Sequence, residues 1–113
     1  MNKIVIRGQF PFLPGKADQA KAAAQALRER TLREDKGMVL YEFFVDESNL
    51  TLAVTEAYAD EAALVNHLAA SDFTNLFSNV DMSKGSLQIH GNPSSEMRKT
   101  LGESGPYQLF LPV

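Results

Sequence analysis

Apolar and polar residues alternate with a two-residue period in four segments of the chain, at residues 4–10, 38–46, 50–58 and 86–90. Such alternation places successive side chains on opposite faces of an extended backbone. Polar residues, glycine or proline separate the segments, as is typical of turns. The pattern therefore predicts four β-strands.

Apolar residues spaced three and four positions apart predict helices between these strands. Residues 16–34 carry small apolar side chains at such spacings among charged residues. A second helix is predicted over residues 61–68, because the Asp60 carboxylate before it can accept hydrogen bonds from the first-turn amides. Shorter helical segments are predicted at residues 72–77 and 96–101.

The two middle strands are predicted to form a hairpin with Glu47 and Ser48 as its tight turn. If Asp46 pairs with Asn49, the register places four cross-strand pairs on one face. These pairs are Val39 with Glu56, Tyr41 with Val54, Phe43 with Leu52, and Val45 with Leu50.

Both faces of this hairpin are rich in apolar residues, which is typical of a sheet that is covered on both sides. The few helices of a small domain cover only one face. We therefore expect a second copy of the chain to cover the other face, so that the protein is a homodimer.

The order of elements is βαββαβ over residues 2–90, which predicts an α+β, ferredoxin-like core. Residues 91–113 form a C-terminal extension, with the short helix at 96–101 and an apolar tail at 107–112. We expect this tail to dock as an edge strand on its own sheet or on a partner's. The whole chain, 1–113, is predicted to be one domain.

Composition and charge exclude several classes of function. The 113 residues include 11 basic and 14 acidic side chains, no Cys and no Trp. A chain without a basic cluster is not expected to bind nucleic acid or an anionic membrane surface. A chain without Cys has no disulfide and no thiolate nucleophile. No apolar run approaches the ~18 residues of a membrane helix, so we expect a cytoplasmic protein.

Motifs for metals and for nucleotide cofactors are also missing from the sequence. His67 and His90 do not belong to a cluster with metal-ligand spacing. The glycines do not form a GxGxxG or GxxxxGK[ST] phosphate loop. We therefore expect no metal site and no cofactor.

Two residues are candidates for catalysis. His67 lies at the border of the apolar stripe of its helix, so its imidazole is expected between helix and sheet, either contacting a substrate or satisfied by backbone or water. Glu56 lies inside a strand on an apolar face, where a carboxylate is costly unless paired. It is either a functional group with a raised pKa or a structural group bonded to helix amides or Arg7.

Aromatic residues are numerous for so short a chain, and they have two interpretations. Most are expected to fill the core. A planar hydrophobic ligand would also need aromatic walls with one or two polar groups inside. The candidate substrate-binding residues are Tyr41, Tyr58, Phe73 and Phe77.

Residues 56–67, which read EAYADEAALVNH, and the following Ser71-Asp72-Phe73 resemble the antibiotic biosynthesis monooxygenase superfamily. Members of that family carry an acidic and an aromatic residue two apart, then a D-x-x-A helix start, a helix His, and Ser and Phe. Two features depart from the family: Asp72 stands where a second His is common, and the Trp of the haem-degrading branch is missing.

The resemblance implies a dimeric α/β barrel with a site between sheet and helices in each subunit. It implies a cofactor-independent monooxygenase acting on a quinol or a hydroxylated aromatic small molecule. His67 would be the base that deprotonates the substrate, Glu56 would orient it or bind substrate, and Tyr41 or Tyr58 would donate a hydrogen bond.

Two other functions fit the same sequence. An isomerase of a small carbonyl compound would use the same base and acid without oxygen. A non-catalytic ligand-binding or stress-associated barrel would need only the cavity, because the site and not the fold sets function.

Overall fold

A computed structural model describes residues 3–113. Met1 and Asn2 belong to the predicted domain, and Asn2 also belongs to the predicted core; both lie outside the described residues. Every helix and strand predicted from the sequence is present, and a short 3-10 helix, η1, is added. In chain order the elements are β1 (Ile4–Pro11), α1 (Ala17–Glu34), β2 (Met38–Val45), β3 (Thr51–Tyr58), α2 (Glu61–Ala70), α3 (Thr74–Phe77), η1 (Met82–Lys84), β4 (Ser86–His90), α4 (Ser95–Gly102) and β5 (Gln108–Phe110).

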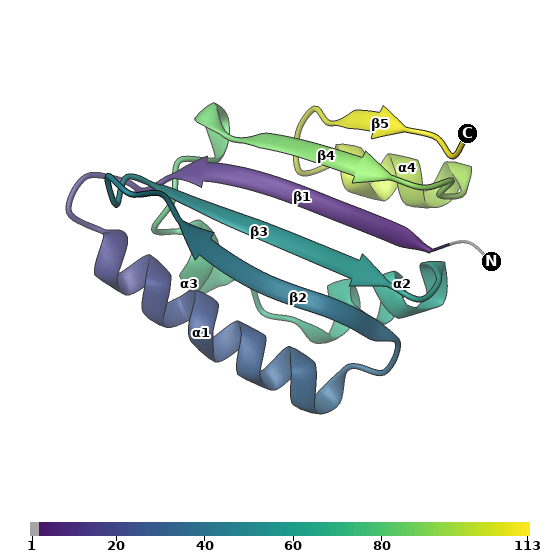
Figure 1. Cartoon of the computed structure of the whole chain (residues 1–113), viewed down its shortest axis with the longest axis horizontal. Coiled ribbons are helices and arrows are strands. Elements are labelled where there is room, and N and C mark those ends of the chain that lie inside the picture. The colour runs from purple at the N-terminus through teal and green to yellow at the C-terminus, as the bar shows by residue number, and fades with distance from the viewer. Residues whose placement is uncertain (1–2) are drawn as a thin grey trace.

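The strands form one sheet in the order β2-β3-β1-β4-β5 (Figure 1). The first four strands pair in antiparallel fashion, whereas β5 runs parallel to β4 at the edge. This arrangement confirms the α+β, ferredoxin-like fold. The apolar tail docks as an edge strand on the sheet of its own chain, which is one of the two arrangements expected from the sequence.

The hairpin register differs from the prediction by two residues. Tyr41 lies opposite Glu56, and Val45 lies opposite Leu52. A shift by two residues returns each side chain to the same face, because side chains alternate with a period of two. Along most of the hairpin the side chains therefore lie on the predicted faces, although the predicted cross-strand pairs are wrong.

The cause of this shift is the turn between β2 and β3. The Asp46 carboxylate accepts hydrogen bonds from the backbone N–H groups of Leu50 and Thr51, at 2.8 and 2.9 Å. Asn49 has a φ of 57°, in the left-handed region that Asn tolerates. The carboxylate thus closes a longer turn than the predicted two-residue connection.

A β-bulge between Met38 and Leu40 changes the face of two residues at the start of β2. Met38 turns toward the helices and packs against the core. Val39, which the sequence places opposite Glu56 on the same face as Tyr41, is 56% exposed instead.

The helices pack on one face of the sheet, which we call the inner face, and the core beneath them has two parts. One cluster lies around β1, β4, α2 and α4, and its buried residues are Ile4, Ile6, Tyr58, Ala63, Leu64, Ile89, Met97 and Leu101. The other lies around α1, β2, β3 and α3, and its buried residues are Ala20, Ala24, Leu27, Tyr41, Leu52, Val54, Leu76 and Val80. The boundary between the two clusters positions the candidate site.

Two further features concern location and metal binding. Within residues 3–113 the structure has no helix long and apolar enough to cross a membrane. The same residues contain no group of three or more His, Asp or Glu side chains that could hold a metal ion. The cytoplasmic location stays a prediction.

Candidate functional site

A cavity of about 190 Å³ lies between the inner face of the sheet and the helices, where the two core clusters meet. We call it the aromatic cavity. Four of the six predicted site residues, Tyr41, Glu56, Phe73 and Phe77, line it. Its remaining lining residues are apolar except for Ser104: Ile6, Phe10, Phe43, Val54, Leu64, Leu68, Met82, Leu87 and Leu101.

The local structure explains why these four side chains meet. Tyr41 and Glu56 are direct cross-strand neighbours on β2 and β3, so both project from the same face. Phe73 and Phe77 lie one helical turn apart at α3, and their rings stack with centroids 5.3 Å apart. The strands thus supply Tyr41 and Glu56, and α3 supplies an aromatic wall.

Glu56 is the one acidic residue in the lining of the aromatic cavity. Burial raises its pKa to about 7, although the hydrogen bond that it accepts from the Tyr58 hydroxyl opposes this shift. The two residues meet because side chains two positions apart on a strand share a face. A carboxylate with this pKa gains and loses a proton near neutral pH, as a general base requires.

The two tyrosines near Glu56 keep their protons. Burial, and then the charge of Glu56, raise the pKa of Tyr41 and of Tyr58 well above the ordinary value. Both hydroxyls are therefore neutral hydrogen-bond donors. Tyr58 already donates to Glu56, and Tyr41 contributes to the cavity wall.

His67 is only 1% exposed and belongs to a buried polar network. Its Nδ1 lies 2.7 Å from Oδ2 of Asp35 and 3.2 Å from Oγ of Ser71. The guanidinium of Arg30 donates to both carboxylate oxygens of Asp35, at 3.1 and 2.9 Å, and to Ser71 at 2.7 Å. This network joins the end of α1 to α2.

The charges in this network follow from its geometry. Burial alone would raise the pKa of Asp35, but hydrogen bonds from Arg30 and His67 hold it below its ordinary value. Burial lowers the pKa of His67 more than the Asp35 carboxylate raises it. His67 is therefore neutral beside an ionised Asp35, so its Nδ1–H donates to the carboxylate and Nε2 keeps a lone pair. Nε2 is buried without a hydrogen-bond partner in the described part of the chain.

His67 lies one layer behind the aromatic cavity. Its ring packs edge-on against Tyr41 and Phe73, at centroid distances of 5.0 and 5.6 Å, and tilted against Tyr58 at 5.8 Å. Tyr41 and Phe73 line the cavity, whereas His67 and Tyr58 do not. The structure thus separates the predicted site residues into a cavity wall and a support behind it.

Sequence reasoning missed Asp35 and Arg30. The sequence contained one indirect signal, because an acidic residue just after the end of a long helix opposes the helix dipole. Asp35 is the C-cap of α1, and its carboxylate would be destabilised there without a cationic partner. Which cation and which imidazole it meets depends on how α1 packs on α2.

The contacts resolve the structural alternative for Glu56. Glu56 does not bond helix amides or Arg7 in the described structure; its side-chain partner is Tyr58. Another strand carboxylate, Glu42, accepts hydrogen bonds from Arg28 of the same chain, the shorter at 2.7 Å.

The fold and the site together define a single-sheet α+β protein with an apolar, aromatic-walled cavity that carries a titratable carboxylate. The family model described as antibiotic biosynthesis monooxygenase matches residues 3–78. Because the match covers more than half of the chain, the protein belongs to the antibiotic biosynthesis monooxygenase family. No curated protein matches the sequence.

Solved structures share the fold at low sequence identity. MupZ from Pseudomonas fluorescens is 21% identical, with a TM-score of 0.78 over 100% of this chain and 92% of MupZ. Protein SO0527 from Shewanella oneidensis is 22% identical, with a TM-score of 0.68 over 80% and 91% of the two chains. A Caulobacter crescentus protein named as a candidate antibiotic biosynthesis monooxygenase is 15% identical, with a TM-score of 0.70 over 82% and 92%. Likeness at these identities shows the fold alone.

Proposed function

We propose that the protein is a cofactor-independent monooxygenase that oxidises a quinol or a hydroxylated aromatic small molecule. The observation that carries this proposal is Glu56, a carboxylate with a pKa of about 7 in the wall of an aromatic cavity. Membership of the antibiotic biosynthesis monooxygenase family supports the same reaction class.

The reaction needs a substrate that transfers an electron to O₂, and a phenolate does this far more readily than the neutral phenol. Glu56 accepts the phenolic proton, and the Tyr41 hydroxyl donates a hydrogen bond to the resulting anion. The apolar wall keeps water away and so strengthens both interactions. Oxygen then adds at a ring C–H carbon, and loss of water leaves a carbonyl there. A quinol and O₂ thus give a hydroxylated quinone and one water.

His67 receives a positioning role in this proposal, although the sequence suggested it as the base. It lies behind Tyr41 and Phe73, so its neutral ring supports their orientation, and Asp35 holds that ring in place. Substitution of His67 is therefore expected to alter KM and kcat without removing the ionisation near pH 7 from the rate profile. Substitution of Glu56 is expected to remove it.

The test is oxygen consumption by the purified, metal-stripped protein with a panel of quinols and hydroxylated aromatics. Glu56→Gln keeps the size of the side chain and should lower kcat/KM at least about 100-fold, the usual contribution of a general base. Glu47→Gln, in the exposed turn, is the matched control and should leave the rate unchanged. The reaction run in ¹⁸O₂ should place one labelled oxygen in the product.

Three outcomes would contradict the proposal in different ways. Oxygen uptake that needs His67 but not Glu56 would identify His67 as the general base. Turnover of a carbonyl compound without oxygen would identify an isomerase. Tight binding of quinones with no turnover would identify a ligand-binding protein.

We also propose a homodimer, formed through the sheet face opposite the helices, which we call the outer face. Aligned positions on all five strands form a row across this face that is apolar except for His90, whose ring stacks on Phe110 at one end. The row consists of Leu40, Ala57, Val5, His90 and Phe110. Leu40 and Phe110, at the two ends of the row, are 39% and 41% exposed, and Phe44, further along β2, is 57% exposed. Apolar side chains exposed together on a sheet favour association.

Sedimentation analysis tests the dimer. Phe44→Glu is expected to convert the dimer to a monomer, because it places a charge inside an apolar interface. Val65→Glu changes an equally exposed apolar residue on α2 and should leave the dimer intact. A monomeric wild-type protein, or a Phe44→Glu dimer, would contradict the proposed interface.

A further inference from the structure

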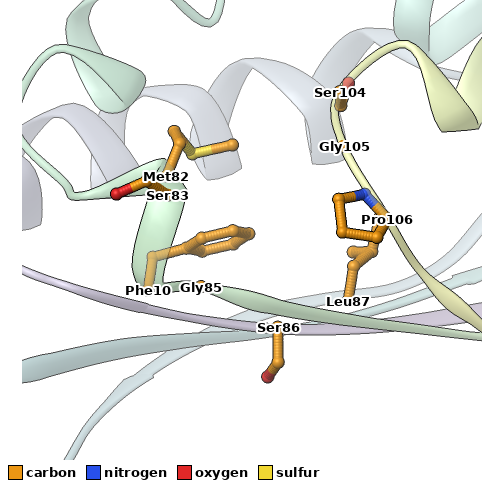
Figure 2. A pocket seen from close by; sticks show the side chains of 9 residues that line it. All are labelled: Phe10, Met82, Ser83, Gly85, Ser86, Leu87, Ser104, Gly105 and Pro106. Carbon is orange, nitrogen blue, oxygen red and sulfur yellow. The ribbon is translucent and has the colours of Figure 1, made fainter.

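A second cavity, of about 290 Å³, lies beside the aromatic cavity. Figure 2 shows the residues that line it. Three parts of the chain enclose it: the end of β1, the segment from η1 into β4, and the loop between α4 and β5. Its lining residues are Phe10, Met82, Ser83, Gly85, Ser86, Leu87, Ser104, Gly105 and Pro106.

The two cavities adjoin, because Phe10, Met82, Leu87 and Ser104 line both of them. Phe10 and Met82 pack on the core cluster of α1, whereas Leu87 packs on the cluster of α2 and α4. The second cavity therefore continues the boundary between the two clusters toward the end of β1, away from Glu56, which lies opposite Ile6.

The lining of the second cavity is uncharged and, apart from its three serines, apolar. Phe10, Met82, Leu87 and Pro106 surround the space in Figure 2, whereas Ser86 points to the opposite side of the sheet. The Ser83 hydroxyl donates to Asp81 at 2.6 Å and is thus already partnered. A charged group would lose its hydration here without gaining a partner, whereas an apolar group would not.

Two glycines determine where the boundary between the cavities lies. A Cβ on Gly85 would overlap the Phe10 ring, and a Cβ on Gly8 would lie 2.9 Å from its Cε2 atom. The absence of a side chain at both positions lets the ring lie close against the sheet. The ring in this position forms a wall common to both cavities and leaves the space above it open.

Most of the second cavity is built by residues that follow the family match. That match ends at residue 78, whereas all lining residues except Phe10 lie between Met82 and Pro106. The C-terminal segment therefore adds a compartment to the site that the matched region does not contain by itself.

We propose that the second cavity is a subsite for an uncharged, apolar substituent of the substrate, and that Phe10 and the loop containing Pro106 set its size. This inference rests on the proposed function for the reacting ring, which lies in the aromatic cavity beside Glu56. The substituent is either a further fused ring or an alkyl chain. Both share the same apolar chemistry.

Binding of oxidised quinones tests the subsite without any turnover. The probes for calorimetric titration are tetramethyl-1,4-benzoquinone, 2-methyl-1,4-naphthoquinone and a decyl-substituted benzoquinone. At least one of the two extended quinones should bind about tenfold more tightly than the single ring. This ratio corresponds to about 1.4 kcal/mol of binding free energy. The extended quinone that binds more tightly than the single ring shows whether the substituent is a fused ring or an alkyl chain.

Pro106→Trp fills part of the second cavity from an exposed position that does not line the aromatic cavity. The substitution should remove the tighter binding of the extended quinone, which we call the affinity gain, and leave the affinity for the single ring unchanged. Pro112→Trp, on an exposed residue that lines neither cavity, is the matched control. Since the natural chain has no Trp, fluorescence of the Pro106→Trp indole also reports the fold locally.

Gly85→Ala supplies an independent variant, because its Cβ would displace the Phe10 ring and should also reduce the affinity gain. The proposal is overturned if Pro106→Trp leaves the affinity gain intact or weakens the binding of all three quinones equally. It is also overturned if neither extended quinone binds more tightly than the single ring. These affinities do not depend on oxygen uptake. Failure of the subsite is therefore distinguishable from failure of the monooxygenase reaction.

Discussion

Asp35 and Glu56 are both carboxylates in the interior of the same small domain, yet their pKa values shift in opposite directions. Burial acts to raise the pKa of each. Asp35 receives hydrogen bonds from Arg30 and His67, which hold its pKa below the ordinary value. Among the described residues Glu56 has only the neutral Tyr58 hydroxyl as a hydrogen-bond partner, so burial prevails and its pKa rises to about 7.

The difference shows that the partner of a buried acid decides its role more than burial does. A cationic partner keeps Asp35 ionised, and that charge in turn fixes the tautomer of His67. The absence of a cation next to Glu56, in the described structure, leaves a group that exchanges its proton near neutral pH. Asp35 thus acts as support behind the cavity wall, and Glu56 is suited to chemistry inside the cavity.

The largest expected effect comes from removing the partnered acid. Asp35→Ala leaves Arg30 and His67 without their shared carboxylate and should destabilise the fold by about 3–5 kcal/mol, the usual cost of breaking a buried pair. Denaturant unfolding measures this loss. Asp18→Ala, whose side chain is 96% exposed, is the control. A loss no larger than that of the control would mean that the network contributes little to stability.

A smaller effect of opposite sign is expected for Glu56, whose partner, the Tyr58 hydroxyl, is neutral. A pKa raised from 4.5 to about 7 means that the folded protein holds this proton more tightly than the unfolded chain does. The resulting stability is complete below pH 4.5 and is lost as the pH rises through 7. Glu56→Gln removes this loss, so it should stabilise the protein at pH 8 by about 1–3 kcal/mol.

The pH dependence distinguishes this effect from a change in packing. Unfolding free energies of wild type and Glu56→Gln should converge toward pH 4 and separate toward pH 8. A constant difference at all pH values would indicate that the substitution acts through packing. Equal stability at pH 8 would mean that the pKa of Glu56 is not raised.

The smallest effect is expected for a third carboxylate, which lies at the surface. Glu42 pairs with Arg28 at 2.7 Å, but both side chains are more than a third exposed, at 36% and 38%. Solvent screens such pairs, so Glu42→Gln should leave the unfolding midpoint nearly unchanged. A marked destabilisation would show that Glu42 also contributes to the proposed dimer interface, and repeating the measurement with the Phe44→Glu variant would test this.

Most of the correct predictions depended on residues that lie close together in the sequence. The alternation of apolar residues predicted four of the five strands, and the apolar tail was expected to form the fifth as an edge strand. Asp60 was correctly expected to cap α2, where its carboxylate accepts from the Ala63 amide at 2.9 Å. Glu56 was recognised as unusual because a strand interior on an apolar face is a costly place for a charge. These inferences depend on a few neighbouring residues, so one sequence suffices.

Contacts between distant segments could not be predicted in this way. The pairing of Asp35 with His67 joins residues 32 apart, and the hairpin register depended on the Asp46 carboxylate closing a longer turn. Neither contact leaves a periodic pattern in the sequence.

The sequence by itself thus determined the order of strands and helices, which faces of the hairpin are apolar, and the candidate residues His67 and Glu56. Only the tertiary structure decided that Glu56 lines a cavity and that His67 lies behind its wall. It also decided that the C-terminal segment closes a second cavity beside the first. The physical reason is that periodicity and capping are local, whereas cavities and pKa values depend on how separate elements pack against one another.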